Sequence, residues 1–373
     1  MKKDKIILVT HEFPPQRGGA GVYCDELAHA ARKLSIDLEI WAPKNSQTKD
    51  SSKIRLMPQR GSQDWRCSWS LYRFIKKNIN SGSYLHIGDP GTLRAVIRFG
   101  WMLRKLPALI ITIHGSELLR FTRFAPEKFL FKKWLRRSEK IHVLSKHNEE
   151  NLRLLCPEIS DRIRKIAGAP ARNVIPRHNI HSKNLSRSAG NLIILLSVGR
   201  IHPRKGQLEL IEAINRLDRS IQEKFICRIV GPVIDSPYFK KLKTLASQSV
   251  CKIIFAGELN DEELRTEYEN SDLFALTSIP QKKSIEGFGF VYLEASAHGL
   301  PIIAHKTGGV EDAVIDGETG LLADPHQPSE LTQKIATLIN HSDLRKQMSE
   351  KGKAWANQHS WSKIARKLYL DKE

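Results

Sequence analysis

Short apolar runs alternate with helical patterns through almost the whole chain, and this alternation limits the possible folds more than any other feature. Parallel strands are joined by long crossovers, usually helices, and strands buried on both faces are nearly continuous apolar runs. The sequence therefore predicts an α/β fold with two doubly wound parallel sheets. The strands are expected at residues 6–9, 38–41, 84–87, 109–113 and 141–145 in a first series and at 192–198, 225–230, 252–255, 273–276 and 301–304 in a second.

The chain of 373 residues has the length of about two domains. A segment at 168–190 is rich in Ala, Pro, Asn, Arg and Ser, and Pro170 and Pro176 would interrupt any regular element there. We therefore expect Rossmann-like domains at 1–170 and 171–355. The final segment, 356–373, has the pattern of an amphipathic helix.

The five cysteines are scattered, odd in number and without the spacing of metal ligands or of a disulfide framework. This pattern favours a reducing cytosol. The apolar run at 6–9 is too short for the core of a signal peptide, and cations interrupt the apolar stretch at 96–113. We expect a cytoplasmic protein, either soluble or peripheral at the inner face of the plasma membrane.

The net charge of +20 is concentrated in the first half of the chain. Residues 1–170 contain 32 Lys and Arg against 16 Asp and Glu, a balance of +16, whereas residues 171–373 contain 28 against 24, a balance of +4. The first half is therefore expected to meet an anionic partner: nucleic acid, a membrane surface or an anionic acceptor. Nucleic acid is disfavoured, because the sequence has no zinc-ligand spacing, RNP-type motif or basic repeat.

Two segments of this basic half, 94–105 and 121–137, mix aromatic residues with cations. One interpretation is a pair of amphipathic helices whose apolar faces enter the core. The other is a surface that docks on anionic lipid and brings a lipid-linked acceptor to the protein.

The loop after the expected strand at 192–198 carries Arg200 and Lys205 between two glycines. Glycine lets the backbone approach a ligand, and the helix that follows offers free N–H groups. A forked guanidinium and a compact ammonium group both suit a diphosphate. The alternative is a loop of solvated cations.

Two carboxylates, Glu286 and Glu294, frame a segment that contains Gly287 and Gly289. Glu294 lies in a largely apolar run, where a buried carboxylate without a partner would be costly. The hydroxyl groups of a ribose would offset that cost, and the glycines would let backbone N–H groups point at phosphate or sugar oxygens. The alternative is two carboxylates that face water.

Two further candidates follow strands of the first series. Gly18 and Gly19 lie between the first strand and its helix, where a simple turn would also explain them. His114 follows the strand at 109–113 and could bond a sugar hydroxyl, although a histidine there is more often structural. Since ligands bind beyond the carboxyl ends of parallel strands, we expect all these loops to share one cleft.

These residues belong to a pattern that resembles family 4 of the retaining, nucleotide-sugar-dependent glycosyltransferases, which have the GT-B fold. The similarity covers most of the chain and is strongest from about 192 to 330. The matching segments are Phe13-Pro-Pro-x-x-Gly-Gly19, Thr112-x-His-Gly-x-Glu117, Ser197-Val-Gly-Arg-x-x-x-x-Lys-Gly206, Glu286-x7-Glu294, Gly299-x-Pro-Ile-Ile303, Thr307-Gly-Gly309 and Asp316-Gly-x-Thr-Gly-Leu-Leu322.

The resemblance implies a role for each candidate residue. Arg200 and Lys205 would hold the donor diphosphate and stabilise the leaving nucleoside diphosphate. Glu286 would contact hydroxyls of the donor sugar with His114 nearby, and Glu294 would hold the ribose. The backbone that approaches the donor or the acceptor would come from Gly18, Gly19, Gly287, Phe288, Gly289 and Phe290.

The resemblance also implies the reaction. Transfer would retain the anomeric configuration by front-face attack, without a metal ion, another cofactor or an enzymatic nucleophile. The domain at 1–170 would bind the acceptor and that at 171–355 the donor, and the helix at 356–373 would cross back to the first domain.

The donor would be of the GDP-mannose or UDP-glucose type, with a slight preference for GDP-mannose. The acceptor would be a glycan or glycolipid of bacterial surface polysaccharide or lipopolysaccharide synthesis. The alternatives are another GT-B enzyme of nucleotide sugars, such as an epimerase or a phosphorylase, and a basic nucleic-acid-binding protein.

Overall fold

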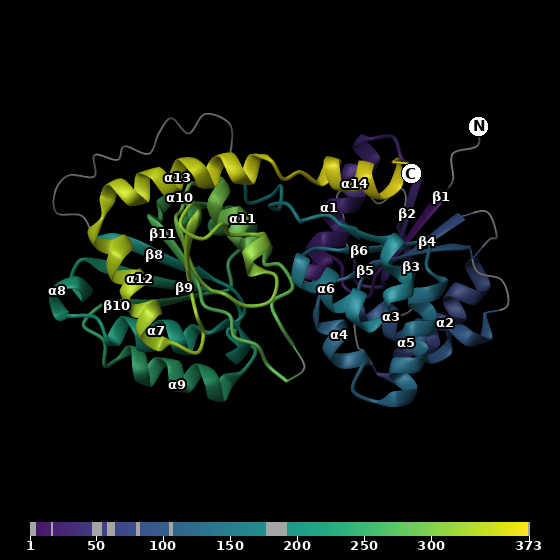
Figure 1. The fold of residues 1–373 in the computed structure, drawn as a ribbon, viewed down its shortest axis with the longest axis horizontal. Helices are drawn as coiled ribbons and strands as arrows, with labels where there is room; N and C mark the ends of the chain where they lie inside the picture. Colours follow the sequence, from purple (N-terminus) through teal and green to yellow (C-terminus); the bar gives the residue numbers. More distant parts are fainter. Residues whose placement is uncertain are drawn as a thin grey trace. The chain divides into compact units, whose positions relative to one another are not determined.

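The computed structural model describes residues 5–15, 18–46, 54–57, 64–79, 83–103, 107–176, 192–282 and 284–371, and the chain forms two compact units (Figure 1). Unit 1 comprises Met1–Gly168, Lys282–Phe288 and Ser360–Glu373. Unit 2 comprises Ala169–Gln281 and Gly289–His359. The chain thus leaves unit 2 for one short segment, Lys282–Phe288, and then returns to it.

Unit 1 contains a parallel sheet of seven described strands in the order β3-β2-β1-β4-β5-β6-β7. Every neighbouring pair is parallel, as the sequence predicts. The strand order reverses between β1 and β4, which is the switch point where doubly wound sheets bind ligands. The strands are β1 (Lys5–Val9), β2 (Leu38–Pro43), β3 (Ile54–Met57), β4 (Ser83–Ile87), β5 (Ala108–Ile113), β6 (Lys140–Val143) and β7 (Ile163–Lys165).

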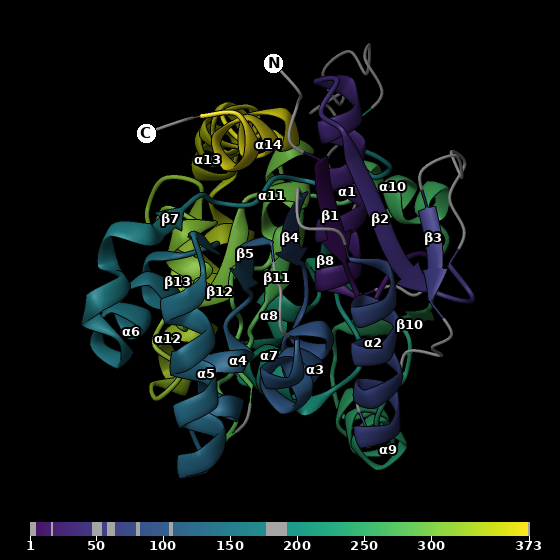
Figure 2. The same ribbon diagram turned by 90° about the vertical axis from the view of Figure 1, so that its right-hand side faces the viewer.

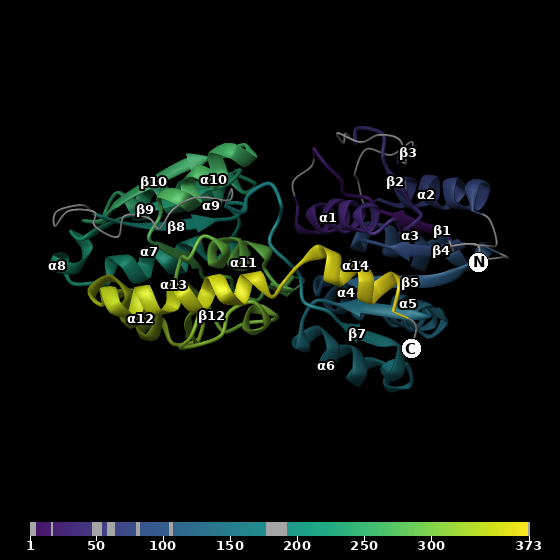
Figure 3. The same cartoon turned by 90° about the horizontal axis from the view of Figure 1, so that it is seen from above.

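Helices cover both faces of the unit 1 sheet. α1 (Gly19–Lys33) and α14 (Trp361–Tyr369) pack together on one face (Figures 1 and 3). On the opposite face, α2 (Trp65–Asn78), α3 (Pro90–Phe99) and α5 (Ala125–Arg137) enclose a hydrophobic core with the sheet (Figure 2). The remaining helical elements of this unit are η1 (Gly100–Met102), α4 (Ser116–Phe121), α6 (Lys146–Leu155) and η2 (Pro157–Arg162).

The last described helix is anchored to the unit 1 sheet by specific contacts. Ser360 caps α14, since its Oγ accepts a hydrogen bond from the Lys363 amide at 3.2 Å. The Trp361 ring lies edge-on to Tyr23 of α1, with ring centroids 5.8 Å apart. The Tyr369 hydroxyl lies 2.6 Å from Nδ1 of His86, a buried residue of β4. The amphipathic pattern of the sequence therefore forms a helix that packs on unit 1.

Unit 2 contains a parallel sheet of six described strands in the order β10-β9-β8-β11-β12-β13. The order reverses between β8 and β11, so this unit has a switch point of its own. The prediction of two doubly wound parallel sheets is confirmed. The strands are β8 (Ile193–Val198), β9 (Phe225–Val230), β10 (Lys252–Gly257), β11 (Leu273–Leu276), β12 (Ile302–His305) and β13 (Gly320–Ala323).

The unit 2 sheet is also covered on both faces (Figures 1 and 3). α7 (Gln207–Asn215), α9 (Ser236–Ala246) and α12 (Pro328–Asn340) lie on one face. α10 (Asp261–Asn270), α11 (Phe290–Ala297) and α13 (Ser342–Asn357) lie on the other, with α11 packed against α13. The shorter elements are η3 (Pro203–Lys205), α8 (Arg219–Gln222) and η4 (Val310–Asp312). None of the described helices is both long and apolar enough to span a bilayer.

Candidate active site

The β8–α7 loop carries the two predicted cations and is held in a fixed shape. Gly206, at φ 71°, is the N-cap residue of α7. A side chain there would overlap the backbone carbonyl of Thr277, which directly follows β11. The Thr277 hydroxyl donates to the Gly206 carbonyl at 2.6 Å. The side-chain amide of Gln207 donates to the carbonyl of Arg200 at 3.0 Å. Arg200 is exposed and Lys205 is half-buried, so solvent reaches at least part of both side chains.

The same loop contains a third cation that the sequence analysis did not select, Arg204. Burial lowers the pKa of His202, and the nearby charges of Arg204 and Arg200 lower it further. The loop therefore holds a neutral imidazole among three cations, since Lys205 also acts in this direction. Gly206, the N-cap residue of α7, has no side chain to cap the helix, and in the first turn the Leu208 N–H donates to the Tyr238 hydroxyl at 2.9 Å. This arrangement is suited to an anion with several charges.

Glu294 lies on α11 of the same unit. Gly289, at φ 84°, is the N-cap residue of this helix, and Phe290 is the first helical residue. The Tyr292 hydroxyl donates to the Leu276 carbonyl at 2.8 Å and so ties α11 to β11. The Glu294 carboxylate is 6 % exposed and accepts a hydrogen bond from Tyr268 at 3.0 Å. The carboxylate is therefore buried and oriented, not a solvated surface group.

The other predicted carboxylate, Glu286, belongs to unit 1 together with Gly287 and Phe288. Both Glu286 and Phe288 are buried. A side chain on Gly287 would overlap the carbonyl oxygen of His114, so only glycine allows this approach. The side-chain amide of Asn148, at the start of α6, donates to the Gly287 carbonyl at 3.5 Å. The structure thus brings Glu286 and His114 into neighbouring segments of one unit.

His114 directly follows β5, and its ring is held by contacts with neighbouring residues. Its Nε2 lies 2.8 Å from the carbonyl oxygen of Gly88, which can only accept, so Nε2 carries a proton. In the neutral ring Nδ1 is then an acceptor, suited to a hydroxyl donor. The His114 amide donates to Oε1 of the buried Glu117 at 2.9 Å, and Tyr23 lies edge-on to the ring at 5.1 Å. The orientation of His114 is therefore set by its neighbours.

Comparison with known proteins shows the family to which the chain belongs. Residues 17–167 match the family model described as Glycosyltransferase Family 4, and residues 179–355 match the model described as Glycosyl transferases group 1. An uncharacterized glycosyltransferase of Methanocaldococcus jannaschii is 30 % identical over 264 residues, which are 70 % of this chain and 67 % of that protein. The chain belongs to the family 4 type of glycosyltransferases.

Two further similarities extend over almost the whole glycosyltransferase. A GDP-mannose-dependent α-(1-6)-phosphatidylinositol monomannoside mannosyltransferase of Mycolicibacterium smegmatis is 24 % identical and covers 94 % of this chain and 93 % of its own. The structure of Anabaena HepE in complex with UDP-glucose has a TM-score of 0.75 at 18 % identity and covers 98 % of each chain. The predicted GT-B fold of the glycosyltransferase is confirmed.

At Gly18, the glycosyltransferase contains a feature that the sequence analysis did not predict. A side chain on Gly18 would overlap the carboxylate of Glu12, which therefore lies directly against this glycine. Gly19 is the first residue of α1, whose first turn has no acidic residue. Because Glu12 is an anion, a diphosphate at Gly18 would require this carboxylate to rotate away.

Two residues of the glycosyltransferase site were missed because their sequence context looks ordinary. Asn148 follows Ser145 by three residues at the start of a helix, a spacing typical of helix capping. The backbone N–H of Asn148 indeed donates to the Ser145 hydroxyl at 3.3 Å. Tyr268 lies in the strongly polar helix α10, where a single tyrosine is typical of a residue that anchors the helix to the core. Only the tertiary contacts with Gly287 and Glu294 connect the two residues to the site.

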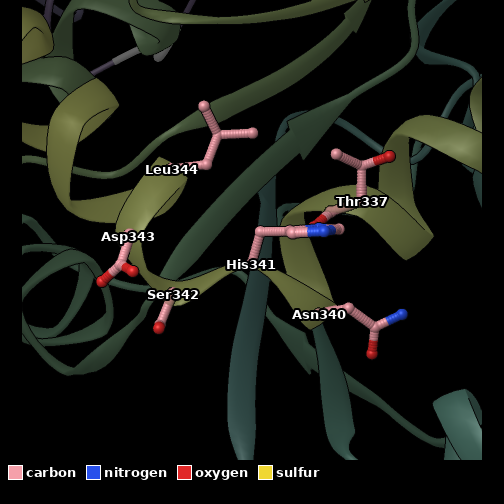
Figure 4. A pocket seen from close by; sticks show the side chains of 6 residues that line it. All are labelled: Thr337, Asn340, His341, Ser342, Asp343 and Leu344. Atoms are coloured by element: carbon pink, nitrogen blue, oxygen red, sulfur yellow. The ribbon is translucent and has the colours of Figure 1, made fainter.

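A hollow of about 420 Å³ between α12 and α13 of the glycosyltransferase contains none of the predicted site residues (Figure 4). It is lined by Thr337, Asn340, His341, Ser342, Asp343 and Leu344. Figure 4 shows these side chains spread around the turn between the two helices, without a set that converges on one point. We therefore assign no part of the site to it.

Proposed function

We propose that the enzyme is a retaining hexosyltransferase, which moves a hexose from a nucleotide-sugar donor to a hydroxyl group of a glycan or glycolipid acceptor. The observation that carries this proposal is the β8–α7 loop, which brings Arg200, Arg204 and Lys205 to the start of α7. Such a loop suits the diphosphate of a donor. The candidate donors are GDP-mannose and UDP-glucose, because the mycobacterial relative is GDP-mannose-dependent and HepE was solved with UDP-glucose.

In this proposal the main catalytic effect is the stabilisation of the leaving diphosphate. The acceptor hydroxyl attacks the anomeric carbon on the face from which the diphosphate departs, and a departing phosphate oxygen takes the hydroxyl proton. The configuration of the sugar is thereby retained. Arg200 and Lys205 neutralise the charge that develops on the leaving group, so the reaction needs no metal ion and no enzymatic nucleophile.

The remaining residues bind the donor. Glu286 accepts hydrogen bonds from hydroxyls of the sugar, and Nδ1 of His114 accepts one more. Glu294 accepts from the ribose hydroxyls. Backbone N–H groups from Gly287 to Phe290 bond sugar or phosphate oxygens, and the backbone at Gly18 and Gly19 approaches the diphosphate or the acceptor after rotation of Glu12. The burial of both carboxylates and the hydrogen bond that orients Glu294 support these roles.

The test compares Lys205→Ala with Lys224→Ala, which removes an exposed lysine of the same unit whose ammonium group donates to Oδ1 of Asn340 at 2.8 Å. Each variant is assayed with GDP-mannose and UDP-glucose. We expect Lys205→Ala to lose about 10²–10³-fold in turnover, the typical effect of removing one donor that stabilises a developing anion. Lys224→Ala should retain wild-type turnover. Near-normal turnover of Lys205→Ala would refute the assignment.

The same assay separates the alternatives. An epimerase would convert the donor without any acceptor, and a phosphorylase would require inorganic phosphate. The anomeric coupling constant of the product distinguishes retention from inversion, and an inverted product would contradict the proposed mechanism. Addition of EDTA should leave turnover unchanged, whereas recovery of lost activity by a divalent ion would contradict metal independence.

We further propose that unit 1 docks on an anionic membrane and collects a lipid-linked acceptor there, at the inner face of the plasma membrane. Phe131, Trp134 and Leu135 of α5 are buried, as expected for a helix that packs on the core. Phe124 and Phe129, by contrast, are each 63 % exposed. Large exposed aromatic side chains next to cations are typical of surfaces that enter a lipid headgroup region.

Besides these two phenylalanines, two strongly exposed tryptophans belong to unit 1. Trp65 starts α2 and Trp101 lies in η1, and they are 62 % and 65 % exposed. The guanidinium of Arg66 lies 5.7 Å from the Trp65 ring, and that of Arg123 lies 5.8 Å from the Phe124 ring. Arg104 and Lys105, which the sequence analysis included in this surface, lie outside the described residues.

Flotation with vesicles tests the membrane proposal. The wild-type enzyme should bind vesicles with anionic lipid and not neutral vesicles. The double variant Trp101→Ser/Phe129→Ser should lose most of this binding, whereas Leu154→Ser, at an 82 % exposed position of α6, should keep it. Equal binding of the wild type to both kinds of vesicle, or full binding by the double variant, would overturn the proposal.

A further inference from the structure

The buried carboxylate of Glu294 has a partner in unit 2 that belongs to a different helix. Tyr268, near the end of α10, donates its hydroxyl proton to Oε2 of Glu294 at 3.0 Å. The Tyr268 side chain is fully buried, and Glu294 is 6 % exposed. The hydrogen bond is therefore shielded from water, where a bond to a charged group is stronger than at the surface.

The tyrosine ring is held in place by two other aromatic side chains. It stacks on His298, with ring centroids 5.2 Å apart and planes 11° apart. It also lies 6.1 Å from Phe274 of β11 at an interplanar angle of 29°. His298 is fixed in turn, because its Nε2 lies 2.6 Å from the carbonyl oxygen of Val174 and donates to it. The hydroxyl of Tyr268 therefore occupies one defined position before any ligand binds.

We propose that Tyr268 is a positioning residue that holds the Glu294 carboxylate in the orientation needed to select a ribose over a deoxyribose in the donor nucleotide. This inference rests on the proposed function, in which Glu294 accepts hydrogen bonds from the ribose. It adds a residue to the donor site that touches no ligand itself. It also assigns to that residue a measurable effect on specificity.

The argument follows from the hydrogen-bonding capacity of a carboxylate. Its two oxygens accept at about four lone-pair positions, and Tyr268 uses one position on Oε2. The carboxylate plane is then fixed by a contact that lies outside the ligand, so the other positions keep the same directions. A preorganised acceptor distinguishes a hydroxyl from a hydrogen, because a substrate that lacks the hydroxyl leaves a buried acceptor unpaired. Without the Tyr268 hydroxyl, the carboxylate loses this fixed contact and is less restricted in its orientation toward the sugar.

The first test measures the binding of GDP, UDP, dGDP and dUDP by calorimetry, without sugar or acceptor. The wild type should bind the better ribonucleotide about tenfold more tightly than its 2′-deoxy form, the effect expected for one hydrogen bond to a charged group. In Tyr268→Phe, which keeps the ring and deletes the hydroxyl, this ratio should fall to about twofold, on the same reasoning. Unchanged discrimination in Tyr268→Phe would overturn the inference.

Tyr292→Phe is the matched control. Tyr292 is also fully buried, lies on the same helix as Glu294 and donates its hydroxyl proton to a backbone carbonyl, that of Leu276, at 2.8 Å. Both variants lose one buried hydroxyl and should show similar decreases in melting temperature. Only Tyr268→Phe should lose discrimination between ribose and deoxyribose. Loss of discrimination in both variants would mean that general loosening of α11 is responsible, and would also overturn the inference.

Glu294→Gln separates a failure of this inference from a failure of the proposed function. If Glu294 reads the ribose, Glu294→Gln lowers the ratio by itself, and adding Tyr268→Phe to it changes the ratio no further. A full ratio in Glu294→Gln, or no binding of any of the four nucleotides by the wild type, would refute the proposed role of Glu294. A low ratio in Glu294→Gln with a full ratio in Tyr268→Phe would refute the role of Tyr268 alone.

Discussion

Acidification should destabilise unit 1 through His142, a fully buried residue of β6. Its Nε2 lies 2.9 Å from the Ile166 carbonyl and must donate, so its Nδ1 accepts the proton of the Tyr23 hydroxyl at 2.8 Å. Tyr23 also bonds Thr112, which lies 2.8 Å from Nε2 of His86. In this chain of hydrogen bonds each imidazole is neutral, and a second proton on His142 would displace the hydrogen bond from Tyr23.

The size of the effect follows from the pKa values. Burial lowers the pKa of His142 from 6.5 to about 4, against the opposing effect of its hydrogen bond to the Ile166 carbonyl. Well above pH 6.5 the residue is neutral in the folded and the unfolded chain, so stability is complete there. As the pH falls below 6.5, the unfolded chain binds the proton first. This residue alone should therefore lower the free energy of unfolding by about 2 kcal/mol between pH 8 and pH 5, and by about 3 kcal/mol once the pH is well below 4.

Denaturant unfolding followed by tryptophan fluorescence measures this loss. Six of the seven tryptophans lie in the segments of unit 1, and only Trp355 lies in unit 2, so the signal reports mainly on unit 1. Because burial also lowers the pKa of His86, the wild type should lose more than the share of His142. The control is His142→Gln, which should lose about 2 kcal/mol less than the wild type between pH 8 and pH 5. An equal pH dependence of the two proteins would refute the reasoning.

Two substitutions of glycine test the close approaches in the site. Gly206→Ala and Gly257→Ala both place a methyl group at a similar positive φ, but only at Gly206 does it overlap a neighbour, the Thr277 carbonyl. Gly257→Ala should cost about 1 kcal/mol of unfolding free energy, and Gly206→Ala at least about 3 kcal/mol, as measured by circular dichroism. Equal losses would contradict the close contact between Gly206 and Thr277. The methyl group of Gly287→Ala would overlap the His114 carbonyl. This variant should lower donor turnover at least about tenfold, with little change in the unfolding of unit 2. Undiminished turnover would show that this contact is dispensable.

The core of the fold was predictable because the buried strands carry their own signal. Each of the ten expected apolar runs coincides with an observed strand, within one or two residues at its ends. The three strands that the analysis missed are β3, β7 and β13, and all three lie at an edge of a sheet. An edge strand is covered less completely, so it need not be a continuous apolar run. β3 and β7 accordingly contain arginine or lysine, and β13 begins with glycine.

The candidate site was predictable to a smaller extent. The sequence analysis selected Arg200 and Lys205 because cations and glycines follow a buried strand, and the structure places them in one loop. It treated Glu286 and Glu294 as a pair, whereas the structure assigns Glu286 to unit 1 and Glu294 to unit 2. It did not select Tyr268 or Asn148, since their functional contacts join segments far apart in the chain.

The sequence by itself determined what short-range patterns encode. The apolar runs, the glycines that follow them and the periodicity of the helices specify parallel α/β units, because burial and backbone geometry act within a few residues. The tertiary structure alone decided how buried polar groups are paired. Tyr268 with Glu294, Asn148 with Gly287, and His142 with Tyr23 and Ile166 are separated by 24 to 139 residues. A buried polar group pairs with whichever partner the folded chain brings close to it, and the neighbouring residues in the sequence do not determine that partner.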